Sequence, residues 1–368
     1  MTQEEIDIKY MRRALELAKK GEGKTAPNPM VGCVIVKDHE VIGEGYHEEY
    51  GKFHAERNAL NSLKKSAEGA DLYVTLEPCC HYGKTPPCTE AIIEHKIRRV
   101  IIACADENPL VGGKGIKILK EHGILVTFGV LKEEALKLNE VFFHYIREKK
   151  PFIAMKYAMT LDGKIATVTK NSKWVTSEES RKYVQVLRNR YKAILVGIQT
   201  VLMDDPMLNC RLEGGVNPIR IILDSNLRIP LESKIVTTAK EIKTIVVTIK
   251  NDVEKESRLR SFGVEILKME GKIHLPDLLK ILGERNIDSI LVEGGGTVHG
   301  SFLQENLVDR VYAFIAPKLI GGVKALSPVL GEGIPKMENA LKLMDTECSM
   351  IQNDILITGR VEKCLQES

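Results

Sequence analysis

Apolar and polar positions near the start of the chain predict a helix followed by a hairpin. Apolar residues recur every three to four positions in residues 6–20, which is the period of an amphipathic helix. Two short runs rich in valine and isoleucine, at 31–36 and 41–45, lie on either side of the polar segment 37–40. That arrangement is typical of two antiparallel strands joined by a turn.

Helical and strand-like segments alternate along the rest of the chain, which predicts three-layer α/β architecture. The predicted helices cover residues 54–63, 89–95, 115–121, 131–147, 177–190, 275–285 and 300–305. The predicted strands cover residues 72–76, 100–103, 124–128, 152–157, 193–196, 219–223, 244–248, 264–267, 289–293, 310–315 and 354–361.

A charged segment ending in a proline divides the alternating pattern into two parts. Residues 148–150 are charged, Pro151 follows, and a new strand begins directly after it. A chain of 368 residues is too long for one ordinary hydrophobic core. We therefore expect two domains, residues 1–147 and 151–365.

Composition narrows the class of protein. The 53 basic and 50 acidic side chains nearly cancel, and no long basic run is present, so the sequence lacks the signature of a nucleic-acid partner. No apolar run reaches the ~18 residues that a membrane span needs. The first seven residues are acidic and polar, unlike a secretory signal. We expect a cytoplasmic protein with no membrane or nucleic-acid partner.

Histidine, glutamate and cysteine residues in the first half form a zinc-deaminase pattern. His54 and Glu56 give H-x-E, Cys79 follows a proline, and Cys88 comes after eight further residues. Two thiolates and an imidazole hold zinc and leave its fourth position open for water. In this pattern the glutamate is not a ligand but moves a proton from the water to the departing amine. We therefore expect His54, Cys79 and Cys88 to bind zinc and Glu56 to be catalytic.

A structural zinc site is the main alternative for these residues. It would need a fourth ligand, which Cys80 or His81 could supply. A structural site has no use for Glu56 or for the proline before Cys79, so we favour the catalytic interpretation. Cysteines elsewhere show no paired spacing, and we expect them to be small core residues. They are Cys33, Cys104, Cys210, Cys348 and Cys364.

Longer motifs surround these residues and continue through the second half. In the first half they are Pro27-Asn28-Pro29-Met30-Val31-Gly32, Gly45-Tyr46-His47, His54-Ala55-Glu56 and the run from Thr75 to Cys88. In the second half they are Lys156 with Leu161-Asp162-Gly163-Lys164, Ser172-Lys173-Trp174, Asp204-Asp205-Pro206 and Glu293-Gly294-Gly295-Gly296. With these motifs the chain resembles, over essentially its whole length, the bifunctional deaminase–reductases of riboflavin biosynthesis.

The resemblance implies a fold and two reactions. The first domain would be a cytidine-deaminase-like α/β/α domain, and the second a dihydrofolate-reductase-like α/β domain. The substrate would be a small phosphorylated molecule, a diaminopyrimidinone that carries a phosphoribosylamino group. The first domain would hydrolyse its ring amine at one zinc ion and release ammonia. The second would reduce the ribosyl group to ribityl with NADPH. The resemblance also implies a homo-oligomer, a dimer or a tetramer.

The resemblance further implies a role for individual residues. Those that would contact the deaminase substrate are Asn28, His47 and Lys84. Those that would line the NADPH site are Ala158, Trp174, Thr200, Asp204, Ser225, Gly295, Gly296, Thr297, Val298, His299, Gly300 and Ser301. Those that would contact the reductase substrate are Lys156, Ser172, Arg188, Leu208, Arg211 and Glu293.

Residue chemistry supports parts of this assignment and leaves alternatives open. The glycines after Glu293 let backbone N–H groups approach a pyrophosphate at a helix N-terminus. Because His299 stands where G-x-G-x-x-G needs glycine, the Rossmann fingerprint is absent. Arg188 and Arg211 suit a phosphate, although each alone is more often a solvated charge. Without the resemblance, Asn28 reads as a turn residue and Trp174 as a packing anchor.

Two other functions compete with this interpretation. A nucleic-acid base deaminase would share the zinc motif, but it leaves the long segment after Pro151 unexplained. A binding or regulatory module with two relic sites is disfavoured by the intact Glu56 and zinc ligands. Within the reductase half, Lys156, Asp204 and Glu293 are equal candidates for assisting hydride transfer. We hypothesise that Lys156 and Asp204 hold the opened sugar near the nicotinamide.

Overall fold

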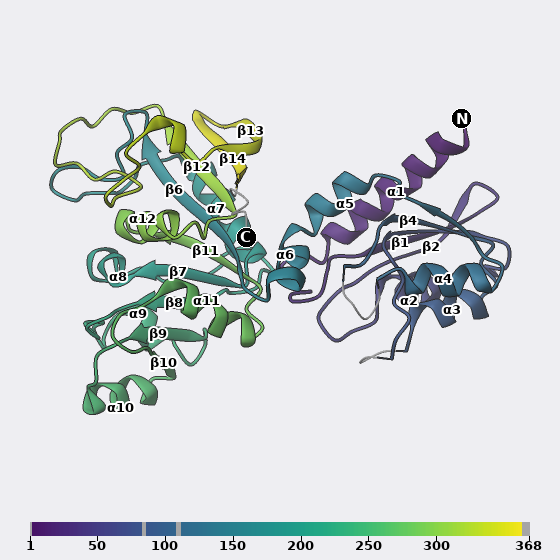
Figure 1. Ribbon diagram of the computed structural model, residues 1–368, viewed down its shortest axis with the longest axis horizontal. Helices are drawn as coiled ribbons and strands as arrows, with labels where there is room; N and C mark the ends of the chain where they lie inside the picture. The colour runs from purple at the N-terminus through teal and green to yellow at the C-terminus, as the bar shows by residue number, and fades with distance from the viewer. Residues whose placement is uncertain (1, 83–85, 108–111, 363–368) are drawn as a thin grey trace. The chain divides into compact units, whose positions relative to one another are not determined.

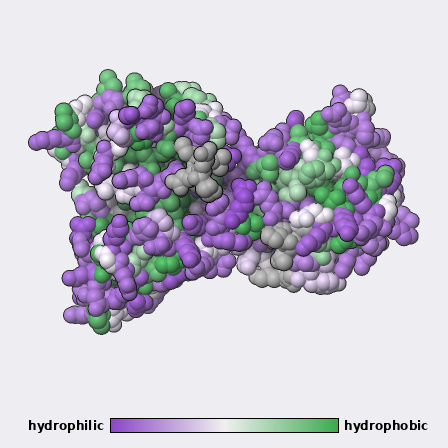
Figure 2. Space-filling view, viewed as in Figure 1, coloured by the Kyte–Doolittle hydropathy of each residue, from purple (hydrophilic) through white to green (hydrophobic). Residues whose placement is uncertain are grey.

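A computed structural model describes residues 2–82, 86–107 and 112–362 of the chain. The chain forms two compact units, Met1–Lys149 and Lys150–Ser368, each with its own central sheet (Figure 1). Within the described residues, helices long and apolar enough to cross a membrane are absent. On the face drawn in Figure 2, hydrophilic residues predominate over both units.

The first unit is built on a five-stranded sheet of order β2-β1-β3-β4-β5. β1 pairs antiparallel with β2 and with β3, whereas β3, β4 and β5 are parallel. The predicted hairpin is confirmed as β1 and β2. The strands are β1 (Gly32–Lys37), β2 (Glu40–Tyr46), β3 (Asp71–Leu76), β4 (Arg99–Cys104) and β5 (Leu125–Phe128).

Helices cover both faces of this sheet, which gives three layers (Figure 1). α1 and α5 pack on one face, and α2, α3 and α4 on the other. α1 approaches β1 closely, because a Cβ on Gly32 would lie 1.9 Å from the Ala14 carbonyl oxygen. The helices are α1 (Gln3–Lys19), α2 (Ala55–Asn61), α3 (Cys88–Glu94), α4 (Lys114–Glu121) and α5 (Lys132–Leu138).

The single helix predicted over residues 131–147 is wrong. The structure has two helices, α5 and α6 (Glu140–Glu148), separated at Asn139. The Asn139 backbone leaves the helical region, with φ −108° and ψ 24°. Its side-chain oxygen accepts from the Met30 N–H at 2.8 Å, and its side-chain nitrogen donates to the Met30 carbonyl at 2.9 Å. A long-range amide pair thus interrupts a segment whose apolar period is helical.

The second unit is built on a nine-stranded sheet of order β10-β9-β8-β7-β11-β6-β12-β14-β13. The pairs from β10 to β12 are parallel, and β14 pairs antiparallel with both β12 and β13. The strands are β6 (Phe152–Thr160), β7 (Ala193–Gly197), β8 (Ile219–Leu223), β9 (Thr244–Thr248), β10 (Val264–Lys268), β11 (Ser289–Gly294), β12 (Arg310–Ala316), β13 (Leu343–Ile351) and β14 (Asp354–Val361).

Alternating side chains of the parallel strands pack into two cores, one on each face of the sheet. On β7, Ala193 and Leu195 face the core that includes α11 and α12, while Ile194 and Val196 face the core that includes α8, α9 and α10. The helices of the unit are α7 (Glu178–Arg190), α8 (Ile198–Asp204), α9 (Lys234–Thr237), α10 (Val253–Ser261), α11 (Leu275–Glu284) and α12 (Gly296–Gln304).

Several elements of this unit depart from the sequence prediction. α8, α9 and α10 are additional helices, two of them short and α10 largely polar. β13 is an additional edge strand whose central residues are exposed, so it has no buried face to produce an apolar alternation. α12 begins at Gly296 and not at residue 300. The sequence predicted too late a start because the first turns of α12 contain glycines, which have a low helix propensity.

Candidate functional site

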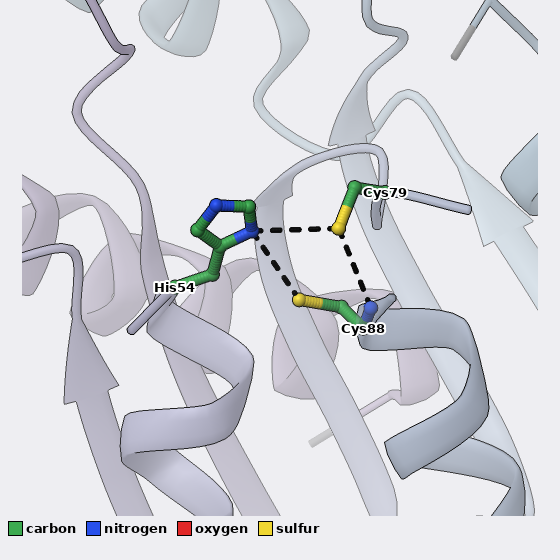
Figure 3. Close-up of side chains that lie close together, drawn as sticks. All are labelled: His54, Cys79 and Cys88. Carbon is green, nitrogen blue, oxygen red and sulfur yellow. Dashed lines mark hydrogen bonds between the residues drawn. The ribbon is translucent and has the colours of Figure 1, made fainter. Parts of the chain in front are cut away.

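Three side chains from separate elements of the first unit point toward one another (Figure 3). His54 is the N-cap of α2, Cys79 follows the end of β3, and Cys88 is the first residue of α3. The His54 Nδ1 atom lies 3.4 Å from the Cys79 Sγ atom and 3.5 Å from the Cys88 Sγ atom. All three possible ligand atoms lie within 4.8 Å of one another.

This spacing fits a zinc ion. Tetrahedral zinc with bonds of about 2.0–2.3 Å holds its nitrogen and sulfur ligands roughly 3.5 Å apart. Cys79 is suited to bind as a thiolate, since a hydrogen bond from Cys88 and the nearby His54 ring lower the pKa of its thiol. The backbone N–H of Cys88 also donates to the Cys79 sulfur at 3.3 Å. The three side chains therefore match a catalytic zinc site, which has three protein ligands and an open position for water.

Glu56 is buried in the first turn of α2, two residues from His54. Burial raises the pKa of its carboxyl group to about 7, although the His54 ring opposes the shift. A group that titrates near neutral pH can both accept and return a proton. The environment of Glu56 is therefore suited to the proton transfers expected of it.

Two side chains to which the sequence assigned no role, Arg57 and Glu77, hold the segments that carry the cysteines. Arg57 donates to the carbonyl oxygens of Pro86 and Pro87, at 3.2 and 3.1 Å, just before Cys88. The buried carboxylate of Glu77 accepts from the N–H groups of Gly113 (3.0 Å) and Ile116 (3.2 Å) at the start of α4. Glu77 lies within the motif from Thr75 to Cys88 and Arg57 directly follows Glu56, so their places in the sequence are the signal that could have indicated them.

Asn28 and His47 lie together beside His54. The Asn28 side-chain nitrogen is 3.2 Å from His47 Nε2, and His47 Nδ1 is 3.0 Å from the Phe53 carbonyl. These partners place the imidazole proton on Nδ1, and burial lowers the pKa of His47. The His47 and His54 rings meet edge to face with centroids 5.5 Å apart. Lys84 lies outside the described residues.

Four of the predicted reductase residues lie near the point where the parallel strands β7 and β11 end. β11 lies between β6 and β7, at the point where the order of the strands reverses. Ligands of open α/β sheets bind in the crevice outside the carboxyl ends of strands at such a point. Lys156 and Ala158 lie on β6, Glu293 is near the end of β11, and Thr200 lies on α8 just beyond β7.

A charged triad lies at this point of the sheet. The guanidinium of Arg188 donates to both oxygens of the Glu293 carboxylate, Nε at 2.7 Å and Nη2 at 2.9 Å. Burial would raise the pKa of Glu293, but Arg188 and Lys156 outweigh it and lower this pKa to about 2. Burial lowers the pKa of Lys156, and Glu293 opposes that shift. Glu293 occupies the forked face of Arg188 that the sequence analysis had matched to a phosphate.

The glycine-rich turn after β11 forms a close backbone arrangement. Gly295 is the N-cap of α12 with φ +78°, a conformation that other residues rarely adopt. A Cβ on Gly294 would lie 3.0 Å from Thr200 Oγ1, and a Cβ on Gly197 would lie 2.9 Å from a Val298 methyl group. α8 and α12 therefore begin side by side, with their N-termini at the same edge of the sheet. This cradle fits the pyrophosphate of a dinucleotide.

Other predicted residues of this half are more dispersed. Trp174 is 63% exposed, with the Arg181 guanidinium 4.3 Å from its ring centre. His299 is buried, and its ring contacts the Val292 and Pro328 carbonyls. Leu208 is buried, whereas Asp204 and Arg211 are exposed. Ser225 follows β8, and Ser172 lies in the irregular segment before α7.

Gly300→Ala should disrupt the second unit selectively. A Cβ at position 300 would lie 1.5 Å from the Leu330 carbonyl oxygen, so the 327–330 segment would have to leave α12. We expect a loss of stability of about 1–3 kcal/mol or more, and loss of the reductase activity that the resemblance implies for this half. Urea unfolding and NADPH oxidation would measure both. Gln304→Ala, an exposed change at the end of α12, is the matched control. Equal stability of the two variants would contradict the close packing of Gly300 against Leu330.

Comparison with known proteins agrees with the functions expected for the two halves. Residues 4–104 match the family described as "Cytidine and deoxycytidylate deaminase zinc-binding region". Residues 151–357 match the "RibD C-terminal domain". A riboflavin biosynthesis protein RibD from Actinobacillus pleuropneumoniae is 50% identical over 354 residues, which are 95% of this chain and 94% of that protein. The chain belongs to the RibD family.

Other members show the same similarity over the full length. RibD of Aquifex aeolicus is 48% identical, over 96% of this chain and 98% of that protein. A crystal structure of the Thermotoga maritima diaminohydroxyphosphoribosylaminopyrimidine deaminase/5-amino-6-(5-phosphoribosylamino)uracil reductase is 41% identical, with TM-score 0.87, covering 98% of this chain and all of that one. One form of Acinetobacter baumannii RibD is 38% identical with TM-score 0.89 and the same coverage.

Membership of the RibD family confirms the predicted fold class. The first unit is a cytidine-deaminase-like α/β/α domain, and the second is the dihydrofolate-reductase-like domain of RibD. Zinc belongs to the first domain, where His54, Cys79 and Cys88 converge, and NADPH belongs to the second.

Proposed function

We propose that this chain carries out two consecutive steps of riboflavin biosynthesis. The first is deamination of 2,5-diamino-6-(5-phosphoribosylamino)pyrimidin-4(3H)-one. The second is NADPH-dependent reduction of the resulting 5-amino-6-(5-phosphoribosylamino)uracil to its ribityl form. The observation that carries the first step is the convergence of His54, Cys79 and Cys88 beside the buried carboxyl group of Glu56.

Residues of the first unit bind the base and move protons. His54, Cys79 and Cys88 would hold the zinc ion, which would supply acidification of a water molecule for attack on the ring carbon that carries the amine. Glu56 would accept a proton from the water and deliver it to the amine, which leaves as ammonia. Asn28 and His47 hold the base, with the Nδ1 proton of His47 fixed by the Phe53 carbonyl. Lys84 contributes a cation for the substrate phosphate.

Residues of the second unit orient the cofactor and the sugar. NADPH supplies the hydride, so the protein mainly aligns the reactants. The glycine turn at 294–296 receives the pyrophosphate, and Ala158, Trp174, Thr200, Asp204 and Ser225 complete the cofactor site. Glu293 orients Lys156 electrostatically, and Arg188 fixes Glu293 through two hydrogen bonds. Because Arg188 is paired with Glu293, exposed Arg211, in the segment after α8, is the better candidate for the substrate phosphate. Ser172 and Leu208 bound the sugar.

Lys156→Ala and Asp204→Ala should each slow reduction. Both side chains are expected to position the opened sugar near the nicotinamide, and misplacement by about 1 Å costs up to about 100-fold. We expect a loss of that order in NADPH oxidation, with ammonia release unchanged. Lys182→Ala, on the exposed face of α7, is the control. Wild-type rates of reduction in both variants would contradict this assignment.

We also propose that the chain forms a homo-oligomer in the cytoplasm. β13 is an edge strand that exposes Met344 and Met350, by 43% and 65%, and a long exposed edge invites pairing with a second copy. Thiolate ligands also suit a reducing compartment. Light scattering on the purified protein would test the first point, and a monomer would contradict it. Cell fractionation would test the second.

The deaminase assignment is tested by combining metal analysis with ammonia release. The purified protein should contain one zinc per chain and release ammonia from the diaminopyrimidinone. A single-stranded nucleic acid containing cytosine or adenine should release none. A zinc-loaded chain that is inert toward the pyrimidine would contradict the proposal, and activity on the nucleic acid would favour the rival function.

A further inference from the structure

Arg220 is a fully buried arginine in the middle of the second unit. It lies on β8, and its exposed fraction is 0%. A guanidinium has five N–H donors, and five neutral oxygens surround this one. Nε donates to Thr244 Oγ1 (3.0 Å), Nη1 to the Met207 carbonyl (3.2 Å) and Thr238 Oγ1 (2.9 Å), and Nη2 to the Ile235 (2.9 Å) and Ile242 (3.0 Å) carbonyls.

Burying this charge is costly for the fold. Its hydrogen-bond partners are neutral, and burial lowers the pKa of Arg220 to about 10, so the side chain remains charged at neutral pH. An apolar side chain of similar volume would avoid the desolvation penalty, but the five oxygens would lose their arginine donors. What the arginine adds is direction, because its planar group fixes several backbone carbonyls at once.

One of those carbonyls belongs to the segment 205–211, which follows α8 without helix or strand structure. Arg220 holds the Met207 carbonyl, and Arg188 holds the Asn209 carbonyl at 3.1 Å. Leu208, between them, has φ +48°, a left-handed conformation that an ordinary residue adopts only when its surroundings enforce it. Two arginines on different elements therefore fix consecutive parts of this segment.

Arg220 also holds α9, the helix that contacts the start of the segment 205–211. Arg220 bonds the Ile235 carbonyl on α9, and the Lys234 N–H of α9 donates to Asp205 Oδ1 at 2.9 Å. Asp205 also has a positive φ, of 38°. Arg220 thus reaches the segment directly at Met207 and indirectly at Asp205, next to Asp204.

We propose that Arg220 is a positioning residue for the reduction. It holds the segment 205–211 and the adjoining Asp204, so that Asp204, Leu208 and Arg211 meet the cofactor and substrate. The proposal rests on the proposed reductase function. It requires that Arg220 act through the backbone of this segment and not by contact with either reactant.

Arg220→Met tests the proposal, with hydrogen exchange and kinetics measured on the full zinc-loaded chain. We expect faster amide exchange in residues 204–211, a KM for NADPH or for the aminouracil raised about 10-fold or more, and kcat reduced by up to about 100-fold. Ammonia release should stay within twofold of wild type. A purely structural role would lower kcat in proportion to the folded fraction and leave both KM values unchanged, which would overturn the proposal.

Thr244→Val is the matched control, because it removes the Arg220 hydrogen bond that faces away from the segment. It should lower stability but leave exchange in 204–211 and both KM values near wild type. If it changed them as much as Arg220→Met, the link through Met207 would be refuted. Unchanged exchange in Arg220→Met would refute it independently of any activity. A wild-type chain without NADPH oxidation would instead count against the reductase function itself.

Discussion

The Glu56→Gln variant is expected to bind zinc normally and to lose ammonia release by about 10²- to 10⁴-fold. Glutamine has nearly the same shape, so His54, Cys79 and Cys88 remain in place. It cannot accept the proton from water or deliver one to the leaving amine, and the reaction needs both transfers. Zinc content by elemental analysis and an ammonia assay would show the separation of binding from turnover.

Two controls make this result specific. Glu94→Gln, an exposed change at the end of α3, should leave ammonia release at the wild-type rate. The Glu56→Gln chain should still oxidise NADPH when given the deaminated uracil, because its second unit is intact. Full deaminase activity in Glu56→Gln would exclude the proposed role.

Glu293→Gln is expected to unfold the second unit more easily and to abolish reduction. Removing the carboxylate leaves Arg188 and Lys156 as buried cations without their counter-charge, and the new amide places donors opposite the donors of Arg188. Breaking a buried ion pair in this way costs about 3–5 kcal/mol. Urea unfolding followed by circular dichroism, with NADPH oxidation, would measure both effects.

The acid dependence of stability gives a second view of the same triad. Because the folded pKa of Glu293, about 2, lies below its ordinary 4.5, its stabilising contribution is complete above pH 4.5. It is lost as the pH falls toward 2, and Glu293→Gln should remove that dependence. Exposed Glu284→Gln is the control and should leave stability within about 0.5 kcal/mol of wild type. Equal stability of the two variants would contradict a buried, paired Glu293.

The sequence predicted best the features that depend on local periodicity. Buried parallel strands read as continuous apolar runs, and residues 219–223 and 244–248 form β8 and β9 with the predicted bounds. The antiparallel strand β14 also has its predicted bounds, residues 354–361. The spacing of His54, Cys79 and Cys88 was informative because each residue lies at the boundary of a predicted helix or strand. His54 and Cys88 lie at the starts of helices, and Cys79 lies just after a strand. The structure brings these three side chains together, while their role as ligands remains a proposal.

Features that depend on long-range contacts could not be predicted. Asn139 interrupts a helix because its amide pairs with Met30, which is 109 positions away in the sequence. Arg188 was expected to bind a phosphate, since nothing local in the sequence indicates Glu293 as its partner 105 positions away. Arg220 looks like an ordinary charged residue within a strand. Only the fold shows that five oxygens from separate segments surround it.

The most direct test of the two-step account is NADPH oxidation with each pyrimidine, on zinc-loaded and zinc-stripped protein. Zinc-loaded protein should oxidise NADPH with the diaminopyrimidinone only after ammonia appears, and with the aminouracil at once. Zinc-stripped protein should fail with the first substrate and retain activity with the second. NADPH oxidation by zinc-stripped protein given the diaminopyrimidinone, or loss of activity with both substrates, would contradict a zinc deaminase followed by an independent reductase.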